Sequence, residues 1–232
     1  MPNAIKRALE AALARGACYI GEIAIWPSEG GFALSHRDDK QLKEWQVSGK
    51  VQDALEIAKL DDAGNYRPLK TAPNLRHGWR LEMATLDEVA RALDYFYPGR
   101  LALFAAWKGE QLKTTALRET LDRQSGMYRV TSKISDAQIN DLVGGFCRSD
   151  GGCLRTILWR RDASGFVAST RLPAEKFDTS HDQTLGPGSP TSAATATAAT
   201  VIPLLCQEAC NLLVAECRKV VKMEGAAPSA PE

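Results

Sequence analysis

The sequence lacks the two features that most simply indicate a membrane or a nucleic-acid partner. No run of about 18 apolar residues, the length that a membrane-spanning helix needs, occurs in its 232 residues. The 29 lysines and arginines are balanced by 28 aspartates and glutamates, so the basic excess typical of nucleic-acid-binding proteins is missing. The chain opens on a charged, helix-like pattern instead of the apolar segment of a signal peptide. We therefore expect a cytoplasmic protein that binds neither membrane nor nucleic acid.

Cysteines are also few, and their number argues against a disulfide scaffold. Six cysteines in 232 residues are well below the density of small disulfide-rich proteins. In a reducing compartment, clustered thiols are more often metal ligands or redox groups. The sequence has no glycine-rich phosphate loop followed by Lys-Ser/Thr and no dinucleotide-binding fingerprint. The cysteines are therefore the main candidates for a functional site.

Hydrophobic periodicity predicts an α+β fold made of two small α/β-type domains. A helix over 3–15 is followed by a strand over 18–26 and a returning strand over 31–36. Capping boxes, Thr85-x-x-Glu88 and Ser135-x-x-Gln138, mark the starts of two further helices. Near the C-terminus, a helix is predicted over 204–222, with Pro203 in its first turn.

A domain boundary is predicted near residue 112, after the break at Pro98-Gly99. The predicted units are a first domain over 1–112 and a second over 113–224. Residues 185–200 have low complexity and no charge, so we expect a flexible inserted linker without a function of its own. Residues 225–232 are expected to form a disordered tail.

Four cysteines of the second domain have the spacing of a metal centre. Cys147 and Cys153 stand at the two ends of a glycine-rich loop, in a C-x5-C pattern. Cys206 and Cys210 form a C-x3-C pattern, which on the predicted helix places both sulfurs on one face. Four thiolates are the standard ligand set of a 4Fe-4S cluster. We therefore predict such a cluster on these four residues.

Other interpretations of the cysteines remain open. A structural zinc site also takes four cysteines, but it usually uses tighter knuckles than C-x5-C, so the spacing favours the cluster. Cys18 heads an apolar strand and is expected in the core. Cys217 lies seven residues after Cys210 on the same face of the predicted helix, so it could approach the site, but the favoured interpretation is a core residue or a spare thiol.

Two arginines lie beside the first cysteine pair: Arg148 directly follows Cys147, and Arg155 lies two residues after Cys153. Guanidinium groups bind carboxylates in bidentate fashion, so these two arginines are our candidates for holding the carboxylates of a tetrapyrrole or of an acidic partner. The alternative is a solvated surface with local ion pairs.

The cysteine blocks resemble known families. The pair of patterns is similar to the cluster motif of sirohaem-containing sulfite and nitrite reductases, although the rest of the chain is not. A closer resemblance is to the iron–sulfur region and its stabilising domain that are fused behind a cobalt or sirohydrochlorin chelatase-like domain in some bacterial proteins. The segments that carry it are YRPLK at 66–70, GWRL at 78–81, RQSGMYR at 123–129, FCRSDGGCLRTILW at 146–159 and IPLLCQEACNLL at 202–213.

This resemblance implies that the first domain is the stabilising domain and that the second holds a 4Fe-4S cluster on the four cysteines. It further implies a link to tetrapyrrole biosynthesis, with a separate chelatase-like protein or a tetrapyrrole as partner. The chelatase domain itself is missing, and the three histidines, His36, His77 and His181, are scattered along the sequence. We therefore do not expect a self-contained chelatase.

Three functional hypotheses follow. The first is a redox or accessory protein whose cluster serves a tetrapyrrole-metal enzyme on another chain. The second is a scaffold or interaction module in which a zinc ion or a cluster is a structural staple. The third, an enzyme acting on a tetrapyrrole at the cluster, rests on analogy with the sirohaem reductases.

Overall fold

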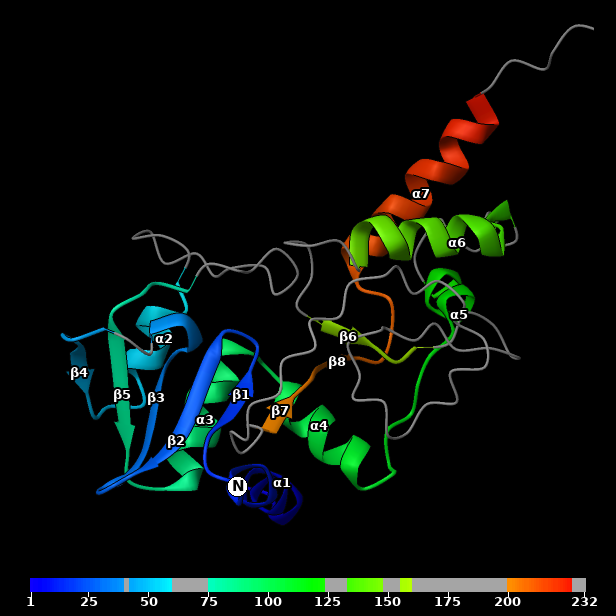
Figure 1. Cartoon of the computed structure of the whole chain (residues 1–232). Coiled ribbons are helices and arrows are strands. Elements are labelled where there is room, and N and C mark those ends of the chain that lie inside the picture. The colour runs from blue at the N-terminus through cyan, green and yellow to red at the C-terminus, as the bar shows by residue number, and fades with distance from the viewer. Residues whose placement is uncertain (40–41, 60–74, 124–132, 148–154, 160–199, 227–232) are drawn as a thin grey trace, which may run out of the picture.

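The structure of the chain is a computed structural model that describes residues 1–39, 42–59, 75–123, 133–147, 155–159 and 200–226. It combines helices with a mixed sheet, which confirms the α+β class (Figure 1). The described helices are α1 (Asn3–Leu13), α2 (Asp53–Ile57), α3 (Leu86–Phe96), α4 (Arg100–Lys108), α5 (Leu117–Asp122), α6 (Asp136–Leu142) and α7 (Asn211–Ala226). The described strands are β1 (Cys18–Ile20), β2 (Ile23–Ser28), β3 (Gly31–His36), β4 (Gln46–Ser48), β5 (Trp79–Met83), β6 (Arg155–Ile157), β7 (Thr200–Ile202) and β8 (Leu204–Cys206).

A six-stranded sheet forms the larger part of the fold, with the strand order β4-β5-β3-β2-β1-β7. The inner strands are antiparallel, whereas the edge strands β4 and β7 run parallel to their neighbours. In the register of β3 and β5, Phe32 lies opposite Met83 and Ser35 lies opposite Arg80. The end of β3 is therefore beside the start of β5.

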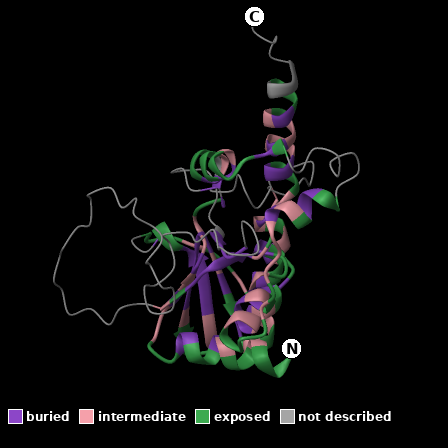
Figure 2. Cartoon of the chain, turned by 90° about the vertical axis from the view of Figure 1, so that its right-hand side faces the viewer, coloured by how far each residue is buried: buried purple, intermediate pink, exposed green. Residues whose placement is uncertain are grey.

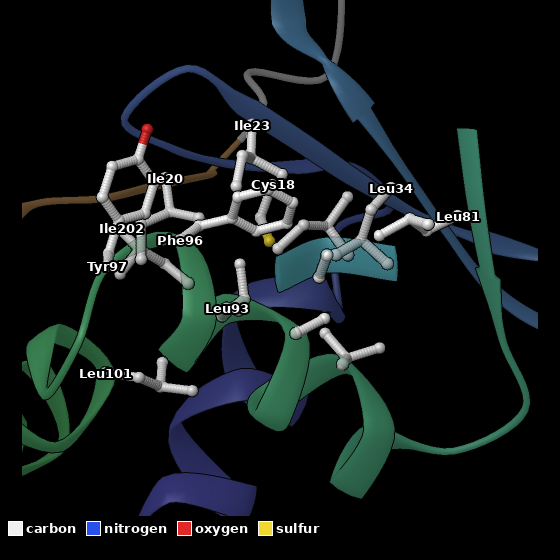
Figure 3. Close-up of a cluster of buried hydrophobic side chains, with 14 of the residues drawn as sticks. Cys18, Ile20, Ile23, Leu34, Leu81, Leu93, Phe96, Tyr97, Leu101 and Ile202 are labelled. Atoms are coloured by element: carbon white, nitrogen blue, oxygen red, sulfur yellow. The ribbon is translucent and has the colours of Figure 1, made fainter. Parts of the chain in front are cut away.

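Helices α1 and α3 pack on one face of this sheet, and their apolar side chains fill the space between the two layers. Figure 3 shows the strands above and the helices below, with Leu93 and Phe96 of α3 reaching toward Cys18, Ile20 and Ile23. The buried residues are concentrated along the strands and the inner helix faces (Figure 2). Helix α3 begins with the predicted capping box, since Thr85 and Glu88 exchange both hydrogen bonds.

The segment 18–26 is not one strand, as the sequence predicted, but the hairpin β1–β2. Ile20 pairs with Ile23, so Gly21 and Glu22 alone form the turn. Gly21 has a φ of 55°, a left-handed conformation that two-residue hairpin turns require and that glycine adopts without strain. The Tyr97 hydroxyl accepts a hydrogen bond from the Glu22 N–H at 2.8 Å, which satisfies a buried donor of this turn. The second predicted hairpin, β2–β3, is confirmed.

The C-terminal part of the chain contributes to both halves of the fold. Strand β7 adds to the edge of the large sheet beside β1, and Ile202 and Leu204 belong to the same core as Cys18. Pro203 separates β7 from β8, which pairs in parallel with β6 in a second, two-stranded sheet. The domain boundary near residue 112 stays a prediction. Strand β7 comes after that boundary in the sequence, but it pairs with β1, which comes before it.

A second hydrophobic core lies among α5, α6, α7 and the β6–β8 pair. Its buried residues include Leu121, Ile139, Trp159 and Leu213. Helix α6 begins with the predicted capping box of Ser135 and Gln138. Helix α7 points away from the six-stranded sheet in both views (Figures 1 and 2).

Several predicted boundaries near the cysteines are wrong. The helix predicted over 204–222 begins at Asn211 instead, because residues 200–206 form β7 and β8. Helix α6 continues past Leu142 as a π-helical turn, Val143–Cys147. Helix α7 runs to Ala226, into the predicted tail, and Thr200 of the predicted linker begins β7. The rest of the linker and the rest of the tail fall outside the described residues.

Candidate metal centre

Cys147 is the last residue of the π-helical turn that extends α6. Its side chain is buried, with 8% of the residue exposed, and it belongs to the second core. A π-helical turn widens the helix locally and is frequent at functional sites. Here the π-helical turn ends on a cysteine whose side chain lies in the core and not in solvent.

Cys206 is the last residue of β8, and its backbone is fixed from several directions. The Leu158 N–H donates to the Cys206 carbonyl at 2.8 Å. On either side, Arg100 Nη1 donates to the Leu205 carbonyl at 2.7 Å, and the Thr115 N–H donates to the Gln207 carbonyl at 3.1 Å. The residue is 9% exposed. The fold thus holds this sulfur in a defined place in the second core.

Cys210 directly precedes α7, and its carbonyl accepts the first helical hydrogen bond, from the Val214 N–H at 3.0 Å. The prediction that Cys206 and Cys210 share one helical face is therefore wrong, because an irregular loop joins them. Cys210 is half-buried and packs against the second core. Cys210 lies beside the first turn of the 16-residue helix α7. The N-terminal end of a helix dipole favours negative charge, and a thiolate ligand carries such a charge.

Cys217 lies on α7 in the same core and is fully buried, at 0% exposed. The core therefore gathers four described cysteines, Cys147, Cys206, Cys210 and Cys217, from the π-helical turn, β8, the start of α7 and its middle. The described cysteines form no disulfide. A core position was the favoured prediction for Cys217, and its burial agrees with that prediction.

The remaining predicted site residues fall largely outside the described part of the chain. Cys153 and Arg148 belong to the segment 148–154, which is not described. Arg155 is placed as the first residue of β6, but its side chain is not described. The assignment of these three residues stays a prediction.

A buried hydroxyl in this region is unsatisfied among the described residues. Thr120 lies on α5 beside Leu117 and Leu121, both of which belong to the second core. Its Oγ1 is buried and has no hydrogen-bond partner within the described structure. A buried hydroxyl without a partner is rare in proteins and requires an explanation.

The described cysteine sulfurs are not close enough to one another to be identified as the ligands of a single metal ion. Among the described residues, the group whose donor atoms lie close enough for one ion is His36, Asp39 and His77, and it contains no cysteine. The four ligands of a cubane bind four different irons, so they stand further apart than the ligands of one zinc ion. The preference for a cluster over zinc rests on the cysteine spacing.

Cys18 has a different role from the other described cysteines. It is 0% exposed in the first core, between the sheet and α3 (Figure 3). Burial raises the pKa of its thiol from the ordinary 9.0 to about 12. The predicted interpretation of Cys18 as a core residue agrees with this environment.

We expect Cys18 to resist alkylation in the folded protein. The thiolate is the reactive form, and a pKa near 12 instead of 9.0 lowers its fraction roughly a thousandfold at pH 8. The check is iodoacetamide labelling followed by peptide mass spectrometry, with denatured protein as the control. Labelling of Cys18 at the same rate in both states would contradict the assignment.

The same shift predicts a loss of stability in alkaline solution. Between about pH 9 and pH 12 the folded state keeps the Cys18 proton that the unfolded state releases, so the free energy of unfolding falls as the pH rises through that window. Cys18→Ala should remove this component.

Comparison with known proteins defines the class of this chain. Residues 5–111 match the DR2241 stabilising domain, and residues 109–219 match a 4Fe-4S iron-sulfur cluster binding domain. The fold and the cysteine-containing core therefore belong to a class in which a stabilising domain precedes a cluster-binding domain. Together the two matches cover residues 5–219, and they confirm the resemblance that the sequence predicted.

A solved structure shows the same fold. It is that of DR2241 from Deinococcus radiodurans, described as a multi-domain protein with structural similarity to chelatases and with two additional novel domains. The identity is 24% and the TM-score 0.62, with 95% of this chain covered. This chain spans 42% of the length of DR2241.

No curated protein matches this chain significantly. In the part of the chain that the structure describes, no helix combines the length and the apolar character needed to cross a membrane.

Proposed function

We propose that this chain binds one 4Fe-4S cluster through Cys147, Cys153, Cys206 and Cys210, and that it acts as a redox or accessory protein for tetrapyrrole metal-chelatase chemistry. The observation that carries the proposal is the gathering of three of these cysteines in one core from three separate elements. That core lies inside the residues that match a cluster-binding domain. When bound, a 4Fe-4S cluster supplies one-electron transfer.

The chain's own residues suit this cofactor in three ways. The thiols are soft donors, which iron in a cluster prefers. Buried apolar side chains such as Trp159 and Leu213 surround them and keep water away. The unsatisfied hydroxyl of Thr120 adds a donor on α5, and hydrogen bonds to the sulfurs are one way in which a protein sets a cluster's potential.

Charge near the site is largely compensated among the described residues. Arg118 pairs with Asp136 at 3.3 Å, and Arg123 pairs with Glu208 at 3.5 Å, close in sequence to Cys206 and Cys210. These pairs are at or near the surface, so they contribute little stability. We therefore assign the positive charge that a tetrapyrrole carboxylate would need to Arg148 and Arg155, whose guanidinium groups can bind it in bidentate fashion.

The partner in this proposal is a chelatase-like protein or a tetrapyrrole. Its support is the solved relative, which is described as similar to chelatases and which is longer than this chain. A reducing compartment such as the cytoplasm would keep the thiols available for iron.

The redox role is tested by anaerobic reduction of the full chain with dithionite, followed by electron paramagnetic resonance. We expect about one spin per cluster after reduction and its disappearance after reoxidation, because a redox cluster must cycle reversibly by one electron. A change of the visible spectrum on adding a tetrapyrrole would identify the partner as the small molecule.

The second candidate function is structural. The cysteines join segments that are far apart in the sequence, namely the end of α6, the end of β8 and the start of α7. A cluster or zinc ion in that position would staple these elements together. A metal centre that resists dithionite while its removal unfolds the second core would favour this scaffold role over the redox role.

A further inference from the structure

Two histidines that are far apart in the sequence meet in the first half of the fold. The imidazole rings of His36 and His77 have centroids 4.1 Å apart. Nδ1 of His77 lies 2.6 Å from Oδ1 of Asp39. One donor atom from each of these three residues can be chosen so that all lie within 4.8 Å of one another. We call this group the His-Asp-His cluster.

The sheet register creates the cluster. His36 ends β3, and Asp39 follows in a single 3₁₀ turn, Arg37–Asp39. Because β3 and β5 are antiparallel with Ser35 opposite Arg80, the chain just before β5 passes the end of β3 and brings His77 to it. The three histidines are scattered along the sequence, but the fold brings His36 and His77 together.

Two of the three residues are held firmly, and the third is open. Asp39 is fixed by the Gly78 N–H, which donates to its Oδ2 at 2.8 Å. Nδ1 of His36 accepts from the Asp38 N–H at 3.2 Å, a bond that ligation through Nδ1 would replace, and its Nε2 faces Oε1 of the buried Glu22 at 3.7 Å. The side chain of His77 is 62% exposed, compared with 5% for Asp39. Solvent therefore reaches the cluster from the His77 side.

The environment of the cluster is acidic. The carboxylates of Glu22 and Asp39 are buried, and Asp38 lies 3.8 Å from His36. Glu22 also accepts the Leu75 N–H at 3.3 Å, so it is positioned as a carboxylate behind His36. Carboxylates that orient a ligating imidazole from behind are typical of metal sites in proteins.

A simpler interpretation of the His-Asp-His cluster is a purely structural one, in which hydrogen bonds link two loops. This interpretation accounts for Asp39. It does not require His77, since the Gly78 N–H already ties Asp39 to the same loop. Nor does it require two imidazoles, tilted by 51° to each other, beside a buried carboxylate. Two histidines and one carboxylate are a common set of protein ligands for zinc and for other divalent transition ions.

We propose that His36, Asp39 and His77 form a second metal site, open on the His77 side, that takes a divalent first-row transition ion such as Zn²⁺. Zinc lies about 2.0–2.2 Å from such nitrogen and oxygen donors, so two donors of one ion are at most about 4 Å apart. In a tetrahedral shell the donors are about 3.3–3.6 Å apart, so the widest pair closes by up to about 1.5 Å and the 2.6 Å pair of His77 and Asp39 opens, movements that fall mainly on the exposed His77. The site is independent of the cysteine core and of the function proposed for it.

The test uses the full chain, purified without oxygen and then equilibrated with Zn²⁺ alone. Zinc affinity is measured by competition with a chromophoric chelator, and zinc ligation by X-ray absorption at the zinc edge. The variants are His77→Gln and Asp39→Asn, with His181→Gln as the matched histidine control. His77→Gln changes an exposed side chain, so it is expected to fold, which a circular dichroism spectrum checks.

We expect one zinc bound through nitrogen and oxygen at about 2.0–2.1 Å, without the sulfur shell at about 2.3 Å that cysteine ligands would give. His77→Gln and Asp39→Asn should each weaken binding at least tenfold, roughly the lower limit for losing an orienting contact alone. His181→Gln should leave the affinity within about twofold of the parent, since a residue outside the ligand set changes it little. Zinc bound only through sulfur, or equal affinity in folded His77→Gln and in the parent, would overturn the second site. Iron content measured on the same samples reports separately on the cysteine centre.

Discussion

Cys206→Ser is expected to abolish most of the iron and acid-labile sulfide bound by this chain and to unfold its second core at a lower denaturant concentration. Serine oxygen is a hard donor and a poor ligand for cluster iron. Among the described cysteines proposed as ligands, Cys206 has its backbone fixed by Leu158 and by the bonds to its two neighbours. Loss of its sulfur leaves the site with three thiolates.

The loss of stability has two causes. A hydroxyl at a position that is 9% exposed replaces a sulfur in an apolar core, which costs about 1–3 kcal/mol if it finds no partner. The cross-link that the cluster would provide between α6, β8 and α7 is also lost, and binding to the folded state alone is a direct source of stability. Urea unfolding followed by tryptophan fluorescence measures the sum, since Trp159 lies in this core.

Two other cysteines provide the controls. Cys217→Ala removes a buried sulfur from the same core, and Cys18→Ala removes one from the first core. Both should lower stability by about 1–2 kcal/mol, as the loss of a small buried side chain usually does, while the iron content stays at the parent level. Iron lost in Cys217→Ala but kept in Cys210→Ser would show that the ligand set is wrong.

Gly31→Ala should destabilise the first half of the fold by about 3 kcal/mol or more, because it combines a strained backbone with a clash. Gly31 begins β3 with a φ of 140°, a region that residues with a side chain rarely adopt. A Cβ at this position would run into the carbonyl oxygens of Met83 and Ala84. Both obstacles are backbone atoms of the neighbouring strand end, so they cannot move aside easily.

The neighbouring Gly30→Ala is the matched control. A Cβ at Gly30 meets nothing within 4 Å, and its φ is not in the left-handed region. We expect a change of no more than about 0.5 kcal/mol there, as for other open surface positions. Equal midpoints of urea unfolding for the two variants would show that the turn between β2 and β3 is not built as described.

The sequence predicted best those features that depend on neighbours along the chain. The capping boxes at Thr85 and Ser135 are confirmed because each needs only residues three positions apart. The β2–β3 hairpin is confirmed because its turn residues lie between two apolar runs. The fold class follows from the same local patterns.

The features that depend on distant partners were predicted less well. Residues 200–206 have helix-compatible spacing, but β7 pairs with β1 and β8 pairs with β6, both far away in the sequence. Such pairing overrides local periodicity, and with it the prediction of a shared helical face for Cys206 and Cys210. The turn at Gly21 was hidden inside an apolar run.

The sites show the same division. Cysteine spacing pointed to Cys147, Cys206 and Cys210, and the structure gathers them in one core together with Cys217. The His-Asp-His cluster could not be found in this way, because the register of β3 and β5 brings His77 to His36. The unsatisfied hydroxyl of Thr120 likewise has no signal in the sequence.

The most direct test of the account is the iron and acid-labile sulfide content of the full chain purified without oxygen, together with its visible spectrum. The account predicts about four irons and four sulfides per chain, with the broad visible absorption of a thiolate-bound cubane. Folded protein that holds zinc on its cysteines, or that takes up no iron and sulfide under reconstitution, would contradict it.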